Sequence, residues 1–168
     1  AIFTGYIAEA LSENIQPKIN SNDAYLIGLL HDIGKTFIEK VVPHVYRQVL
    51  PSLSEEMGRL NAELSLFGMD HTEIGAMMLE YWNFDTQLCN AIAYHHSPIF
   101  AFSDAMGHLA WASNQIAHWQ DGKASDDAKI TDKTYQFLHL QNETALLAIR
   151  QKKKKKVDAF QKKLEAII

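Results

Sequence analysis

This chain of 168 residues has little cysteine, little proline and no long hydrophobic run. Its one cysteine, Cys89, cannot form an internal disulfide, which excludes a disulfide-rich secreted scaffold. The apolar runs are only a handful of residues long, so we expect no membrane-spanning helix. By contrast, 47% of the residues are hydrophobic and 10% are aromatic, which excludes a disordered chain. Because a chain of this length buries roughly 70% of its unfolded surface, we expect one folded domain over residues 1–168.

Charge is distributed unevenly along the chain. The net charge is −4, but residues 150–168 hold eight basic and two acidic side chains, so residues 1–149 carry −10. An acidic body is a poor generic nucleic-acid binder, and we expect no specific nucleic acid as a partner. We expect the basic tail to be a solvated helix end or to rest on the acidic body. Contact with phosphates or an anionic lipid surface is the alternative.

Apolar residues recur at helical spacing almost throughout the sequence, and no stretch alternates long enough to predict a strand. The clearest stripes are Ile7-Ala10-Leu11-Ile15, Ile74-Met77-Met78-Tyr81 and Leu109-Ala112-Ile116-Trp119. Asp70 followed by Glu73 predicts a capping box, and Asp85 predicts a second helix start. The pattern predicts an all-α bundle of seven or eight helices, ending in a basic helix from about residue 142. Because the chain starts at Ala1 rather than methionine, we expect it to be part of a longer protein.

The segment GLLHDIGK, at residues 28–35, brings an imidazole and a carboxylate together at His31 and Asp32. A divalent metal can accept both groups as ligands. Lys35 lies one helical turn beyond the histidine and could reach a phosphate oxygen or protonate a leaving group. Taken alone, a His-Asp pair is common and is weak evidence for a metal site, and the alternative is a structural histidine paired with the neighbouring carboxylate. We expect Gly34 to let the chain turn directly afterwards.

Two later segments carry further imidazoles near helix ends. His71 lies in the first turn of its helix, and Gly75, which is unfavourable inside a helix, indicates close approach of another backbone or of a site. His95 and His96 point about 100° apart on a helix, so both serve one site only near its end, which Pro98 supplies. A single histidine is more often structural, but three such segments can converge inside a helical bundle and form a metal site. We therefore expect the three segments to meet in one pocket.

Together these segments resemble the HD superfamily of metal-dependent phosphohydrolases, and most closely its HDOD branch. Residues 67–84 (FGMDHTEIGAMMLEYWNF) are similar to that branch's helix G-x-x-H-x-x-x-G-A-x-L-L-x-x-W. Residues 91–98 (AIAYHHSP) are similar to its A-I-x-x-H-H-x-P. The resemblance covers roughly residues 3–118 and implies the HD-type helical fold.

The resemblance also implies a set of metal ligands: His31, Asp32, His71, His95 and His96. It implies that Asp32 and Lys35 take part in catalysis where such a protein is active. Imidazoles with one carboxylate suit iron, manganese, zinc or nickel rather than calcium. The chain departs from the family in two places, because no histidine precedes His31 and Asn114 stands where the family has its closing aspartate. We expect Asn114 to line the same pocket.

Three functions remain open from the sequence. The first is a signalling module of a bacterial, cytoplasmic regulatory protein, with weak or absent metal and no turnover, which binds protein partners or a nucleotide or phosphate ligand. The two departures favour it, since losing an imidazole and a carboxylate weakens metal affinity and water activation. The second is a metal-dependent phosphohydrolase acting on a nucleotide or other phosphate ester. The third is a helical interaction domain with structural histidines. No Gly-Tyr-Pro follows the paired histidines, which argues against a cyclic di-GMP phosphodiesterase.

Overall fold

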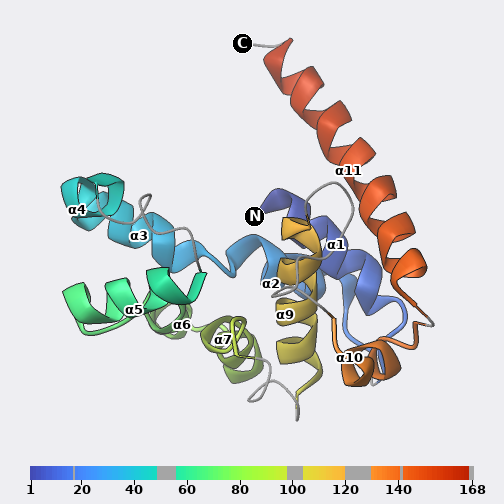
Figure 1. Cartoon of the computed structure of the whole chain (residues 1–168), viewed down its shortest axis with the longest axis horizontal. Coiled ribbons are helices and arrows are strands. Elements are labelled where there is room, and N and C mark those ends of the chain that lie inside the picture. The colour runs from blue at the N-terminus through green and yellow to red at the C-terminus, as the bar shows by residue number, and fades with distance from the viewer. Residues whose placement is uncertain (17, 49–55, 98–103, 120–129, 141, 167–168) are drawn as a thin grey trace.

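The computed structural model describes residues 1–16, 18–48, 56–97, 104–119, 130–140 and 142–166. These residues form helices and no strand, which confirms the all-α prediction (Figure 1). The helices are α1 (Ile2–Ser12), α2 (Ser21–Leu30), α3 (Ile33–Val41), α4 (Pro43–Gln48), α5 (Glu56–Phe67), α6 (His71–Tyr81), α7 (Thr86–Ala93), α9 (Ala105–His118), α10 (Asp132–Phe137) and α11 (Glu143–Glu165). No helix in these segments is long and apolar enough to cross a membrane.

The described part of the chain contains more helices than the seven or eight expected. Two of them, α4 and α10, have only six residues each. Six residues complete fewer than two turns, so an apolar stripe has no room to repeat. Local capping still stabilises α10, since the side chain of Thr131 accepts a hydrogen bond from the backbone N–H of Thr134. Helices this short cannot be predicted from apolar periodicity.

Side-chain caps stabilise the beginnings of α6 and α7. Asp70 accepts hydrogen bonds from the backbone N–H groups of Thr72 and Glu73, and Glu73 accepts one from Asp70, which confirms the capping box of α6. Asp85 accepts a hydrogen bond from the backbone N–H of Leu88 at the start of α7, as predicted. Each cap contributes about 1 kcal/mol.

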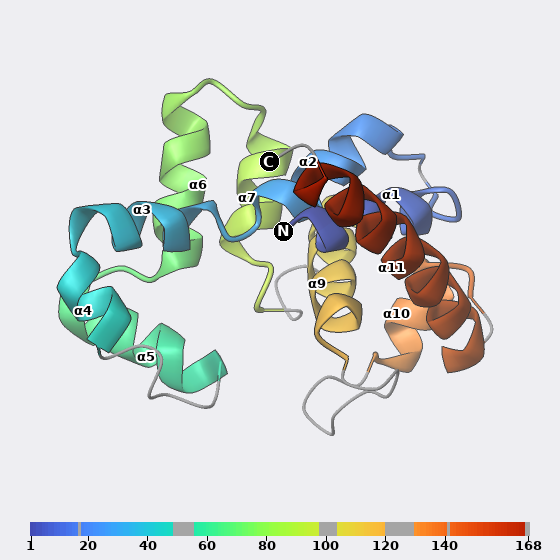
Figure 2. The same ribbon diagram turned by 90° about the horizontal axis from the view of Figure 1, so that it is seen from above.

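The apolar core lies where α1, α2, α7 and α9 meet. Helix α1 packs extensively against α2 and α9, and α7 packs against α9. The aliphatic side chains at these contacts are fully buried; they include Ile7, Leu11, Ile27, Ile92, Leu109 and Ile116. Figures 1 and 2 show α3 to α6 extending to one side of this core, with α10 and α11 on the other side.

Two helix crossings leave no room for a side chain. A Cβ atom at Gly28 would lie 2.6 Å from the backbone of α1. A Cβ atom at Gly34 would overlap the carbonyl oxygen of His71 and lie 2.9 Å from the backbone nitrogen of Gly75. The close backbone approach expected at Gly75 is therefore confirmed. Gly34 lies within α3, so it is needed for this approach to α6 rather than for the turn that we expected.

The basic helix α11 begins close to the expected residue and packs against α1 and α9. Arg150 donates hydrogen bonds to two carbonyl oxygens at the C-terminal end of α9. Lys153 forms an ion pair of 2.9 Å with Glu9 of α1. Farther along, α11 extends beyond the other helices (Figure 1), and Lys162 and Lys163 are exposed. The tail thus rests on the acidic body over its first half and is solvated over its second.

Candidate metal centre

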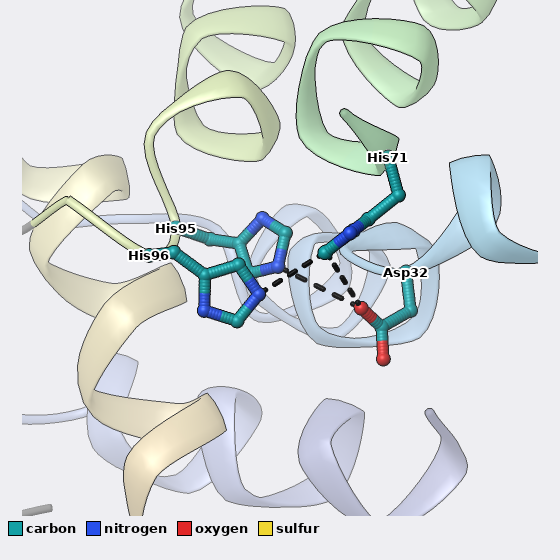
Figure 3. A group of neighbouring side chains, drawn as sticks. All are labelled: Asp32, His71, His95 and His96. Carbon is teal, nitrogen blue, oxygen red and sulfur yellow. Dashed lines mark hydrogen bonds and ion pairs between the residues drawn. The ribbon is translucent and has the colours of Figure 1, made fainter. Parts of the chain in front are cut away.

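Three helix ends meet in the middle of the molecule. His31 and Asp32 connect α2 to α3, His71 is the first residue of α6, and His95 and His96 follow the end of α7. Figure 3 shows the side chains of the aspartate and the last three histidines pointing toward one another. The structure therefore brings together all three segments that the sequence singled out.

Asp32 lies at the centre of this group. Its Oδ1 atom is 3.5 Å from Nε2 of His71 and 3.7 Å from Nε2 of His95. Its Oδ2 atom is 3.2 Å from Nε2 of His31, whose ring meets that of His95 edge-on with 5.1 Å between centroids. Nε2 of His71 is in turn 3.1 Å from Nε2 of His96. Imidazoles from three parts of the chain thus lie around one carboxylate. We call this group the cluster; its residues are His31, Asp32, His71, His95 and His96.

Hydrogen bonds at Nδ1 determine which nitrogen of two rings faces Asp32. Nδ1 of His31 lies 2.9 Å from the carbonyl oxygen of Gly28, and Nδ1 of His95 lies 2.7 Å from that of Ile92. A carbonyl oxygen only accepts hydrogen bonds, so each Nδ1 carries the proton. In the neutral rings, each Nε2 then presents its lone pair to the carboxylate.

These inward-facing nitrogens are unsatisfied. Nε2 of His31 and Nε2 of His95 are buried without a hydrogen-bond partner in the described part of the chain. The ammonium of Lys35 lies 2.8 Å from Oδ1 of Asp32 and balances the charge of the carboxylate. Buried acceptors that face one another are unfavourable unless a proton or a metal ion lies between them. The donor set therefore fits a bound cation.

Electrostatics keep the cluster in the protonation states that metals require. Burial alone would raise the pKa of Asp32, but the neighbouring imidazoles and Lys35 outweigh it and hold that pKa well below its usual range. Burial lowers the pKa of His95 to about 4. Burial, together with the neighbouring His95, also lowers the pKa of His96. At neutral pH Asp32 is thus charged while His95 and His96 are neutral, which are the states in which these groups bind a metal.

Four of the side chains place ligand atoms around a common point. One atom each from Asp32, His71, His95 and His96 lies within 4.8 Å of the other three. In a tetrahedral site with metal–ligand bonds of 2.0–2.1 Å, ligand atoms lie about 3.3 Å apart. Three of the observed separations, 3.1, 3.5 and 3.7 Å, are close to this value. His31, which the family resemblance includes among the ligands, lies instead against the other oxygen of the carboxylate.

Asn114 is buried in α9 at 2% exposure. Its Oδ1 atom is buried without a hydrogen-bond partner. Helix α9 packs against α2 and α7, the helices that lead into His31 and His95. Among the described residues, no hydrogen bond or ion pair joins the Asn114 side chain to the cluster. Its place in the pocket therefore stays a prediction, whereas Lys35 directly contacts Asp32.

Glu63 of α5 is a further participant that the sequence interpretation missed. Its side chain is 1% exposed, and Oε2 lies 2.6 Å from Nδ1 of His71. The available signal was its position, three residues after Leu60 and four before Phe67, which places it on the same helix face as these apolar residues. A glutamate on an apolar face requires a buried partner.

A helical bundle whose helix ends bring a His-Asp pair together with further histidines is the arrangement of HD-type domains. Residues 1–98 match the HDOD domain family, and this chain belongs to that family. An uncharacterised protein of Treponema pallidum (strain Nichols) is 27% identical over 151 residues, which cover 85% of this chain. The chain spans only 28% of the length of that protein.

Three solved structures share the fold, each at less than 25% sequence identity. The "Putative phosphohydrolase" from Shewanella amazonensis SB2B is 22% identical with a TM-score of 0.70, over 90% of this chain and 56% of that one. The MmoQ response regulator from Methylococcus capsulatus is 18% identical with a TM-score of 0.62, over 88% and 59% of the two chains. An HDOD domain protein with unknown function from Geobacter sulfurreducens is 21% identical with a TM-score of 0.55, over 98% and 58%. At this level of identity the likeness establishes the fold alone.

Proposed function

We propose that this chain is a regulatory HDOD module whose cluster binds one divalent transition-metal ion without hydrolysing a substrate. The observation that carries the proposal is the inward-facing set of three imidazoles and one carboxylate, whose ligand atoms lie within 4.8 Å of one another. Asp32, His71, His95 and His96 would hold the ion. Imidazole and carboxylate ligands suit zinc, iron, manganese or nickel.

Binding would change the hydrogen bonding of the paired histidines. If Nε2 of His71 presents a lone pair, then the hydrogen at the 3.1 Å contact belongs to Nε2 of His96. That proton must leave Nε2 before the nitrogen can become a ligand. The hydrogen bond between His71 and His96 would therefore be lost when an ion binds to both rings.

The absence of turnover rests on Asn114. A neutral amide cannot supply the negative charge of the carboxylate that the family has at the corresponding position, and it cannot act as a general base. The buried amide oxygen without a hydrogen-bond partner supports a retained pocket from which the charged group has been lost. A signalling role is also consistent with the fold shared with a response regulator. We expect a protein partner or a phosphate-bearing ligand, and a cytoplasmic setting.

The second candidate is a metal-dependent phosphohydrolase for a nucleotide or other phosphate ester. Lys35 favours it, because its ammonium is held beside Asp32, where it could also bind a phosphoryl oxygen. The fold likeness to a protein described as a phosphohydrolase points the same way. A bound metal would supply an activated water in this reaction. Asp32 would orient that metal, and Lys35 would hold the charge that develops on the phosphoryl group.

One experiment separates these functions. Metal-free protein is titrated with Zn²⁺ and Mn²⁺, and the loaded protein is assayed with bis(p-nitrophenyl) phosphate, p-nitrophenyl phosphate and nucleotides. We expect one ion per chain, abolished in Asp32→Ala and retained in Asp23→Ala, an exposed control in α2, with no hydrolysis. Hydrolysis that Asp32→Ala abolishes would establish the phosphohydrolase instead. No binding of either metal would leave the histidines with a structural role.

A further inference from the structure

Helix α5 buries a charged residue while it exposes apolar ones. Glu63 is 1% exposed, whereas its neighbours Leu64 and Leu66 are 51% and 48% exposed. Among the α5 side chains that the structure describes, Glu63 is the one classed as buried. A buried carboxylate is unfavourable unless it is paired and hydrogen-bonded. The orientation of α5 is therefore governed by what this carboxylate contacts.

The contact is with the first residue of α6. Oε2 of Glu63 accepts a hydrogen bond from the backbone N–H of His71 at 2.8 Å and lies 2.6 Å from Nδ1 of the same residue. The first N–H groups of a helix have no partner within the helix, and that end carries partial positive charge. One carboxylate oxygen thus satisfies a buried backbone donor that has no partner within the helix, and it holds the imidazole ring as well.

The histidines of the cluster obtain their Nδ1 partners in two different ways. His31 and His95 each stand at the end of a helix, and each Nδ1 donates to the carbonyl oxygen of the residue three positions earlier. His71 begins its helix, so no preceding helical turn can provide that carbonyl. Glu63, from a separate helix, provides the acceptor instead.

We infer that Glu63 is a positioning residue of the cluster, which holds the proton on Nδ1 of His71 and turns the lone pair of Nε2 toward Asp32. The role in metal binding rests on the proposed function, whereas the role in orienting the ring does not. A carboxylate acceptor makes an imidazole a stronger electron donor to a metal than a carbonyl acceptor does. Glu63 therefore makes His71 a stronger ligand than His95, whose Nδ1 donates to a carbonyl oxygen.

The first test uses Zn²⁺ alone as the probe. Glu63→Gln keeps an oxygen acceptor but removes its charge, and Glu63→Met removes the acceptor while keeping a similar volume. We expect Zn²⁺ affinity to fall about tenfold in Glu63→Gln and about a hundredfold in Glu63→Met, the range for loss of a carboxylate behind a ligating histidine. Glu80→Gln is the matched control, because Glu80 is exposed near the end of α6, and its affinity should equal that of the unsubstituted protein.

The second test needs no metal. In nitrogen-edited NMR spectra of the metal-free protein, His71 should carry its proton on Nδ1 in the unsubstituted protein and in Glu63→Gln, but populate both tautomers in Glu63→Met. If the unsubstituted protein binds no Zn²⁺, the metal proposal fails while this measurement still decides the role of Glu63. Unsubstituted affinity and an unchanged His71 tautomer in Glu63→Met would overturn the inference. If that variant does not fold, undiminished Zn²⁺ affinity in Glu63→Gln would overturn it.

Discussion

Where α1, α2 and α9 meet, the buried side chains are mainly aliphatic, whereas the junction of α3, α6 and α7 buries histidines around a carboxylate. Leu11 and Leu109 are fully buried on the first side. On the second side His71 and His95 are buried equally completely, while Phe37 of α3 and Met77 of α6 are 45% and 54% exposed. Apolar packing stabilises the first region under any condition that preserves the hydrophobic effect. Stability of the second depends on protonation and on bound cations.

The largest expected effect comes from the α3–α6 crossing. Gly34→Ala places a methyl group against the backbone of α6, so we expect unfolding free energy to fall by about 3 kcal/mol, since backbone atoms cannot move aside cheaply. The displaced α6 should also lose Zn²⁺ binding. Leu109→Ala is the control from the apolar region, with a loss of about 2–5 kcal/mol from its cavity. Its folded fraction should still bind Zn²⁺. Denaturant melts measure the unfolding free energy of both variants, and Zn²⁺ titration measures their affinity. An unchanged unfolding free energy and Zn²⁺ affinity in Gly34→Ala would contradict the close approach of α3 and α6.

Acid should weaken the histidine junction more than the aliphatic core. The pKa of His95 is lowered from 6.5 to about 4 in the folded protein. Between these values the unfolded chain binds a proton that the folded chain does not, so stability falls as pH falls. For this group alone the loss approaches about 3 kcal/mol near pH 4. Melts of metal-free protein between pH 7 and 4.5 measure it.

Two variants separate the contribution of His95 to the acid sensitivity from that of other groups. His95→Gln should reduce the pH dependence, because one of the two buried imidazoles with lowered pKa values, His95 and His96, is gone. Leu88→Ala in α7, the helix that precedes His95, should lower stability at every pH without changing the slope, because it removes buried apolar surface only. Equal slopes in His95→Gln and the unsubstituted protein would show that another group causes the acid sensitivity.

A smaller effect is expected where α11 joins the apolar region. Arg150 donates hydrogen bonds to the carbonyl oxygens of Ile116 and Trp119 at the end of α9. Arg150→Ala should cost about 2 kcal/mol, since hydrogen bonds from a charged donor are lost. Arg150→Lys should restore little of this, because lysine lacks the planar fork that reaches two acceptors. Zn²⁺ affinity should stay unchanged in both variants; a loss of affinity would mean that the two regions are coupled.

The smallest effect concerns the lysine run. Lys153 pairs with Glu9, and the ammonium of Lys156 lies 4.1 Å from the centre of the Tyr6 ring. Glutamine at both positions should cost about 1 kcal/mol together, because a partly exposed ion pair and an exposed cation–π contact each contribute roughly 0–1 kcal/mol. Glutamine at the exposed Lys152 and Lys155 should leave the melting temperature unchanged within error. A drop of many degrees in the second pair would mean that α11 packs differently.

Local patterns made much of the fold predictable. The capping box at Asp70 and the cap at Asp85 depend on residues within one turn of each other, so sequence spacing suffices to identify them. The six-residue helices α4 and α10 escaped prediction because they complete too few turns to repeat a pattern. The sequence pattern predicts a turn at Gly34, because the residues next to it in the sequence do not indicate that α6 crosses α3 at that point.

For the cluster, the sequence by itself determined which residue types are present and that they lie near helix ends. The helix ends follow from local hydrogen bonding at the caps and from apolar periodicity. The tertiary structure alone decided how the groups face one another. It placed His31 against one carboxylate oxygen and His71 and His95 near the other. It also brought Glu63 to His71 from a separate helix. These contacts depend on how helices distant in sequence cross, and that is set by packing across the whole molecule rather than by any local stretch of the chain.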